Sequence, residues 1–165
     1  MSAEAADLGN YAVDFLACVP PSLVLHDEDE SYSIPGRTIT QNGGTVWDAS
    51  SSDVREHYPT DRDALRIVQY DSCRGLEGWC VINYAFDDLF DYKYQQWLSS
   101  PQDLGGLFDT REELAAAFAA QWSMIPLTRA MDTLVINISG RQSTVKDALR
   151  KVYERRSDFT EWMKI

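Results

Sequence analysis

The sequence predicts an α/β domain whose mainly parallel sheet is flanked by helices. Two nearly continuous apolar runs, residues 66–70 and 80–84, are typical of strands buried on both faces of a parallel sheet. Thr110 and Glu113 form a capping box that opens a helix, and a third apolar run, residues 134–138, follows it. Because strands and helices alternate along this part of the chain, the α/β class is favoured.

Composition and charge limit the classes of function. The chain has 165 residues, of which 44% are hydrophobic, so it is long enough for about one domain with a real core. Its formal net charge is −11. A protein that wraps nucleic acid by itself usually carries a basic excess. Any contact with nucleic acid is therefore expected to be local or shared with a partner.

Cysteine and histidine usage predicts a reducing environment and no metal site. The three cysteines, Cys18, Cys73 and Cys80, fit neither a disulfide framework nor the spacing of a zinc site. His26 and His57 lie far from any plausible ligand set. No apolar run is long enough to span a bilayer, and the acidic start of the chain lacks the basic region of a signal peptide. We therefore expect a cytoplasmic protein without membrane contact.

The first third of the chain is expected to be a leader followed by an irregular region. Residues 1–10 read as a loose leader, and residues 11–19 form an apolar run that fits either a short helix or a strand. Residues 31–52 are rich in Gly, Ser, Thr and Asn and contain two turn signals. The expected division is therefore residues 1–52 as leader and irregular region, and residues 53–165 as the main domain.

The final third of the chain carries clear helix boundaries. The helix that begins after Thr110 is expected to run past Trp122, and Pro126 ends or kinks it. Ser143 or Thr144 caps a last helix. Its apolar residues share one face at helical spacing: Val145, Ala148, Leu149, Val152 and Tyr153.

Two acidic clusters each allow two interpretations. Residues 27–30 follow an apolar strand, as the magnesium-binding carboxylate of a nucleotide hydrolase does. The sequence contains no Gly-x4-Gly-Lys-Ser/Thr loop for such a magnesium ion to serve, so a solvated loop is favoured. Asp87, Asp88 and Asp91 fit a paired acid–base site or a solvated edge, and the solvated edge is again favoured.

Two motifs carry a resemblance to a known family. The segment Ser72-Cys73-Arg74-Gly75-Leu76-Glu77-Gly78-Trp79, within residues 69–82, resembles motif V of superfamily 1 DNA helicases of the UvrD/Rep type. The segment Pro126-Leu127-Thr128-Arg129-Ala130, within residues 126–138, resembles motif VI of the same helicases. The order of the two motifs, with a helix leading into the second, strengthens the resemblance. It implies a partial or shortened RecA-like domain, the C-terminal one of the two that build the motor.

The resemblance also implies roles for single residues. Arg129 corresponds to the arginine finger that reaches the γ-phosphate of ATP, a task suited to a planar and permanently charged donor. Glu77 corresponds to the carboxylate that contacts the ribose, and Gly75 would let the backbone approach the nucleotide or the partner domain. Thr128 would supply a hydroxyl to the nucleotide. Ser72 and Arg74 would contact nucleic acid or couple the two domains.

Several parts of a complete helicase are missing from this sequence. It lacks the phosphate-binding loop, and Asp71 stands where many relatives carry a histidine that contacts single-stranded DNA. ATP and Mg²⁺ are therefore expected only in a complex with a separate ATP-binding helicase domain or chain, and single-stranded DNA only in that assembly. No ATPase activity is expected of the isolated chain. The alternatives are a non-catalytic helicase remnant that serves as a protein interaction module, and an α/β domain of unrelated function.

Overall fold

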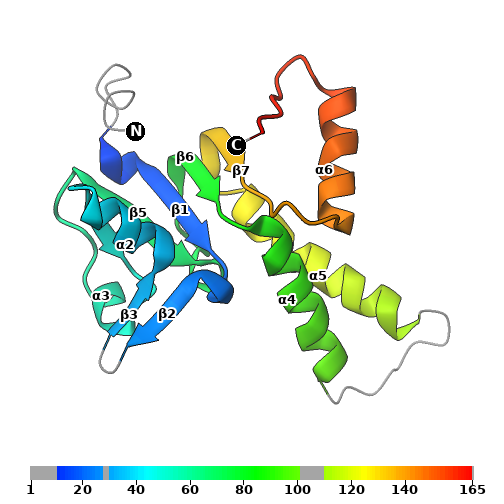
Figure 1. Cartoon of the computed structure of the whole chain (residues 1–165), viewed down its shortest axis with the longest axis horizontal. Helices are drawn as coiled ribbons and strands as arrows, with labels where there is room; N and C mark the ends of the chain where they lie inside the picture. The colour runs from blue at the N-terminus through cyan, green and yellow to red at the C-terminus, as the bar shows by residue number, and fades with distance from the viewer. Residues whose placement is uncertain (1–10, 28–29, 101–109, 165) are drawn as a thin grey trace.

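The central element of the fold is a parallel sheet of five strands. The computed structural model describes residues 11–27, 30–100 and 110–164. The strands lie in the order β4 (Thr45–Asp48), β5 (Ala64–Gln69), β1 (Phe15–Val19), β6 (Gly78–Asn83) and β7 (Ala130–Ile136), and every neighbouring pair is parallel. Helices flank this sheet (Figure 1). The predicted α/β class is confirmed.

The N-terminal apolar run forms the middle strand of the sheet. A short 3-10 helix, η1 (Ala12–Asp14), leads into β1, which pairs with β5 on one side and β6 on the other. After Pro20, a second 3-10 helix, η2 (Pro21–Leu23), leads into an antiparallel hairpin of β2 (Val24–Asp27) and β3 (Glu30–Ser33). Of the run for which a short helix or a strand was expected, residues 15–19 therefore form a strand and residues 12–14 a single 3-10 turn.

The segment expected to be irregular contains a helix and a strand. Helix α2 (Ile34–Gln41) begins where the Ser33 hydroxyl accepts a hydrogen bond from the Gly36 amide, at 3.0 Å. Strand β4 follows and pairs with β5. Gly36 is required for packing, because a Cβ at this position would lie 2.5 Å from Asp48 Oδ2. Pro35 and Gly36 thus belong to a helix start rather than to a turn, whereas the second turn signal is correct, because Asn42 and Gly43 form a turn between α2 and β4.

The connection between β5 and β6 crosses one face of the sheet. A short helix α3 (Ser52–Arg55) precedes β5, and the 3-10 helix η3 (Tyr70–Ser72) follows it. Only residues 70–77 separate β5 from the parallel strand β6, which lies beyond β1. A parallel connection usually takes a dozen or more residues. This crossover, residues 70–77, contains the single 3-10 turn of η3, has no room for an α-helix and packs directly on the sheet.

Three longer helices complete the domain. They are α4 (Phe86–Ser99), α5 (Arg111–Leu127) and α6 (Thr144–Arg155). The predicted capping box at Thr110 is present, as is the predicted cap at Ser143, whose hydroxyl accepts from the Lys146 amide. Pro126 lies one residue before the end of α5. Helix α4 was not predicted; it packs on α5 through Trp97 and Phe118, whose ring centroids are 5.0 Å apart.

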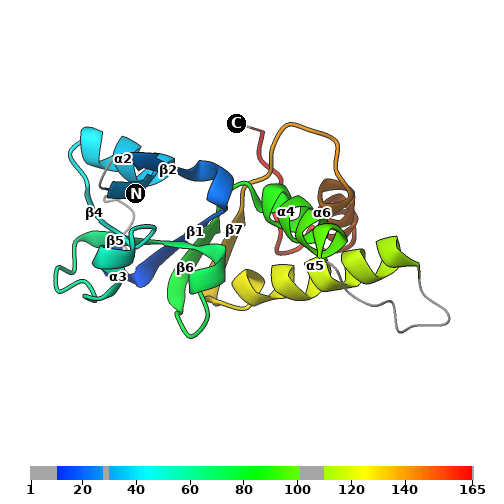
Figure 2. The ribbon, with the colours of Figure 1, turned by 90° about the horizontal axis from the view of Figure 1, so that it is seen from below.

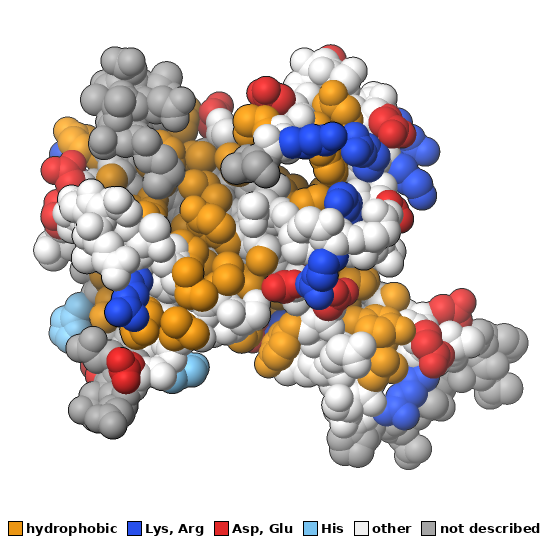
Figure 3. Space-filling model, viewed as in Figure 1, with side chains coloured by type: hydrophobic (Ala, Val, Ile, Leu, Met, Phe, Trp, Pro, Cys, Tyr) orange, Lys and Arg blue, Asp and Glu red, His pale blue; other side chains and the backbone are white. Residues whose placement is uncertain are grey.

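Each face of the sheet has its own apolar core. On one face, Leu16 and Val81 pack with residues of the crossover and of α4, α5 and α6. On the other, Ala17 and Ile67 pack with residues of α2 and the β2–β3 hairpin. Figure 2 shows α2 and α3 on opposite sides of β4 and β5, and Figure 3 shows hydrophobic side chains gathered over β1 and β6. No helix among the described residues is both long enough and apolar enough to cross a bilayer.

Candidate functional site

Glu77 and Arg129, the two residues with the most specific expected roles, lie side by side. Each immediately precedes a strand, β6 and β7 respectively, so both lie at the edge of the sheet where the strands begin, called here the amino edge. The Gly78 amide donates a hydrogen bond to the Arg129 carbonyl at 3.1 Å, and Gly78 pairs with Ala130 in the sheet. The crossover and the end of α5 thus bring the two motifs together.

The Arg129 side chain folds against the end of its own helix. Its Nε donates to the Ile125 carbonyl at 3.1 Å, and one terminal nitrogen donates to Thr128 Oγ1 at 2.9 Å. A cation is favourable here because the last carbonyl groups of a helix carry partial negative charge. The two bonds leave three of the five N–H donors of the guanidinium group for a further acceptor. Arg129 is half-buried, which keeps this group partly accessible.

Thr128 and Gly75 have local structural roles. Thr128 follows the last residue of α5, and its hydroxyl donates to the Ile125 carbonyl at 2.9 Å while accepting from Arg129. Gly75 has a φ of +78°. No heavy atom of the chain lies within 4 Å of a Cβ built on Gly75, so the glycine is needed for its backbone angle and not for close packing within the chain.

A substitution at Gly75 tests this assignment. We expect Gly75→Ala to lower the free energy of unfolding by about 1 kcal/mol, because an L-residue is strained at a positive φ. The matched control is Gly140→Ala, since Gly140 also has open space at the Cβ position but no positive φ. Urea denaturation of both variants is the measurement, and equal stabilities would show that φ at Gly75 is not the reason for the glycine.

The crossover is attached to α4 and α5 by charged groups around one tryptophan. The Arg74 guanidinium lies over the Trp122 ring at 4.4 Å, and Lys93 Nζ lies over the same ring at 3.9 Å. Lys93 is only 2% exposed, and its Nζ forms an ion pair with Asp71 Oδ1 at 2.8 Å. Asp71 therefore neutralises a buried lysine.

Ser72 lies apart from the other motif residues. It ends η3, just beyond the carboxyl end of β5, whereas Glu77 lies at the amino edge. The Ser72 hydroxyl accepts a hydrogen bond from Arg55 of α3 at 2.8 Å. The structure therefore brings together Glu77, Thr128 and Arg129, and places Ser72 at the opposite edge of the sheet.

Two buried cysteines lie where the crossover packs on the sheet. Cys18 in β1 and Cys73 in the crossover belong to the same apolar core. A hydrogen bond between the two thiols raises the pKa of Cys18 well above its usual value and lowers the pKa of Cys73. The charge of Arg129 lowers both pKa values. Both thiols are free.

The acidic clusters have structural partners. Asp87 is fully buried, and its carboxylate accepts hydrogen bonds from the amide and hydroxyl of Ser139. Asp88 forms an ion pair with Arg141 and accepts a hydrogen bond from Ser22. Residues 28–29 of the other cluster lie outside the described residues. Within the described ranges, no group of three or more His, Cys, Asp and Glu side chains is arranged to hold a metal ion.

Sequence reasoning missed several of these contacts. Lys93 and Trp122 were not singled out, although both contact the crossover, residues 70–77. Lys93 could have been noticed as a charge within the apolar spacing of Leu89, Phe90 and Trp97, which is the pattern of a buried helix face.

Comparison with protein-family models, with curated proteins and with solved structures found no match for this chain.

Proposed function

We propose that this chain is the C-terminal motor half of an ATP-dependent DNA helicase, and that it completes a nucleotide site on a separate ATP-binding chain. The observation that carries the proposal is the position of Glu77 next to Arg129 at the amino edge of the sheet. A residue whose carboxylate can accept sugar hydroxyls thus precedes β6, and an arginine with free N–H donors precedes the neighbouring strand β7.

The chemistry of these groups fits one side of an ATP site. Arg129 would donate hydrogen bonds to the γ-phosphate, where a guanidinium group stabilises the charge of the transition state. The Glu77 side chain is exposed, and its carboxylate makes no hydrogen bond or ion pair with any other described residue, so it is available to a ribose. The remaining phosphate contacts and the Mg²⁺ ligands would come from the partner chain.

The contacts of the crossover support a coupling role. Arg74 and Asp71 attach the crossover to α4 and α5, and α5 ends at Arg129. The two motifs are therefore parts of one packed unit. A displacement of Arg74 by nucleic acid or by the partner domain would be transmitted to α5 through Trp122.

The isolated chain is expected to hydrolyse no ATP above the background of the assay. It offers only the completing side of the site, and hydrolysis in this class needs the phosphates and magnesium to be held by another domain. A phosphate-release assay on the purified chain, with and without single-stranded DNA, is the measurement. Turnover that disappears in an Arg129→Ala variant would contradict the proposal, since the chain would then carry a complete site.

The proposed partnership is tested by nucleotide-dependent association. The candidate partner is any Gly-x4-Gly-Lys-Thr domain that the adjacent reading frame proves to encode. Sedimentation should show a complex that is stronger with a non-hydrolysable ATP analogue than without it, because Glu77 and Arg129 would contact the shared nucleotide. If a complex forms with no effect of the analogue in either wild type or Arg129→Ala, the chain is an interaction module and not a motor half.

A further inference from the structure

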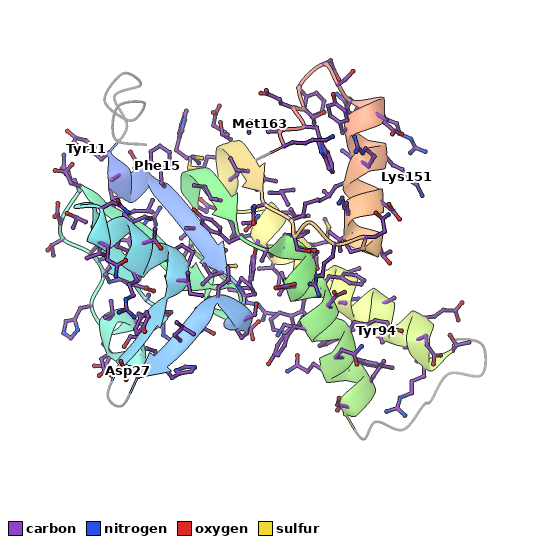
Figure 4. All side chains as sticks on the ribbon, viewed as in Figure 1. Tyr11, Phe15, Asp27, Tyr94, Lys151 and Met163 are labelled. Carbon is purple, nitrogen blue, oxygen red and sulfur yellow. The ribbon has the colours of Figure 1, made fainter. Side chains whose placement is uncertain are left out.

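A second feature of the amino edge lies on the other side of Glu77 from Arg129. It is an open depression of about 420 Å³ between η1, the start of β5 and the end of the crossover. The residues that give it its chemistry are Asp14, Tyr58, Asp61, Arg62, Arg66 and Glu77. Tyr11 and Phe15, which flank η1, mark this end of the sheet in Figure 4. The volume is within the range of small-molecule sites.

Arg66 gives the depression a buried positive charge without an ion-pair partner among the described residues. The residue is 5% exposed. One terminal nitrogen donates to the Tyr58 hydroxyl at 2.8 Å, and the other donates to the Glu77 carbonyl at 2.7 Å. Its Nε has no hydrogen-bond partner, and the guanidinium group makes no ion pair with any described residue. Burying an unpaired charge is costly, so this arrangement indicates an anionic ligand.

A second arginine and a free carboxylate define the rest of the ligand. Arg62 is exposed, lies 5.0 Å over the Tyr11 ring and forms no ion pair among the described residues. Two of the acidic lining residues already have partners. The Asp14 carboxylate accepts a hydrogen bond from the Tyr11 amide, and the Asp61 carboxylate accepts one from the Asp63 amide. The Glu77 carboxylate has no such partner. Two arginines and a free carboxylate suit a molecule with an anionic group and several hydroxyl groups.

We propose that this depression binds a phosphorylated sugar. Arg62 and Arg66 would hold the phosphate, and the Glu77 carboxylate would accept hydrogen bonds from the sugar hydroxyls. The inference shares Glu77 with the proposed nucleotide site, but neither Arg129 nor a partner chain is part of the depression, so binding to the isolated chain can fail without the motor proposal failing. Free inorganic phosphate shares the anionic chemistry but lacks the hydroxyl groups, so the two can be separated by experiment.

Titration calorimetry of the full chain with ribose 5-phosphate, inorganic phosphate and ribose tests the proposal. We expect ribose 5-phosphate to bind at least about tenfold more tightly than either of the other two, because each makes only part of the contacts. Arg62→Gln should weaken this binding by about tenfold or more, since it removes one phosphate contact. Glu77→Gln should weaken the binding of ribose 5-phosphate and leave the binding of inorganic phosphate unchanged.

The control is Arg37→Gln. Arg37 is also an exposed arginine over a tyrosine ring, at 4.9 Å from the Tyr32 centroid, but it lies on α2 outside the depression. Arg62 is the variant of choice because its exposure makes a folding defect improbable, whereas Arg66 is buried. The proposal is overturned by absence of saturable binding at roughly 10 mM ligand, by equal binding of phosphate and ribose 5-phosphate, or by equal effects of Arg62→Gln and Arg37→Gln.

Discussion

Replacing Arg129 by alanine is expected to lower ATP turnover of the assembled motor by about 10³-fold or more, the effect typical of a missing arginine finger. The loss should appear in kcat, because the guanidinium group acts on charge that develops as the phosphoryl group is transferred. The measurement is steady-state ATP hydrolysis by the complex of this chain with its ATP-binding partner, at saturating single-stranded DNA.

Two further variants separate the finger role from a purely structural one. Arg129→Lys keeps a positive charge but not the planar fork of donors, so it should lose most of the activity as well. Thr128→Ala removes the hydroxyl that accepts from Arg129 and donates to Ile125, and should cost less than about tenfold. Turnover of Arg129→Ala within about threefold of wild type would exclude the finger role.

The second large effect is expected at Asp71. Lys93 is almost completely buried, and Asp71 is its only anionic partner among the described residues. Removing one partner of a buried ion pair costs about 3–5 kcal/mol. Asp71 is 51% exposed at its side chain, and solvent screening reduces this value. We therefore expect Asp71→Ala to lower the free energy of unfolding by about 2 kcal/mol, measured by urea denaturation.

A double variant tells the ion pair apart from other effects at Asp71. Lys93→Met replaces the buried ammonium group by an unbranched apolar side chain that can still contact Trp122. In this background no charge remains to be neutralised, so Asp71→Ala should cost less than about 0.5 kcal/mol. A cost of similar size in both backgrounds would show that Asp71 stabilises the crossover in some other way.

The sequence allowed the C-terminal half of the fold to be predicted better than the N-terminal half. Capping residues such as Thr110 and Ser143 act through hydrogen bonds within one helical turn, so they can be recognised locally. Helix α2 was harder to predict. Its first turn contains Gly36, which is needed because Asp48, a residue distant in sequence, lies beside it in space. Helix α4 was missed because Lys93 interrupts its apolar face, and only the contact with Asp71 explains how that charge can be buried.

The candidate site shows the same limit. Motif resemblance identified Glu77 and Arg129, and the structure places them at one edge, joined by the hydrogen bond between Gly78 and Arg129. The motif resemblance could not reveal that the crossover spans the sheet and leaves Ser72 at the other edge. Nor could it identify Arg66, which lies within an apolar strand and is recognisable as an unpaired buried cation only from its surroundings.

The most direct test of the proposed half-site is ATP hydrolysis by equimolar mixtures of this chain and the ATP-binding domain, compared with each component alone. With single-stranded DNA present, we expect the mixture to exceed the sum of its parts by about 10³-fold, because Arg129 then completes the site. A complex that forms but hydrolyses ATP no faster than the ATP-binding domain alone would contradict the claim that Glu77 and Arg129 are half of a working nucleotide site.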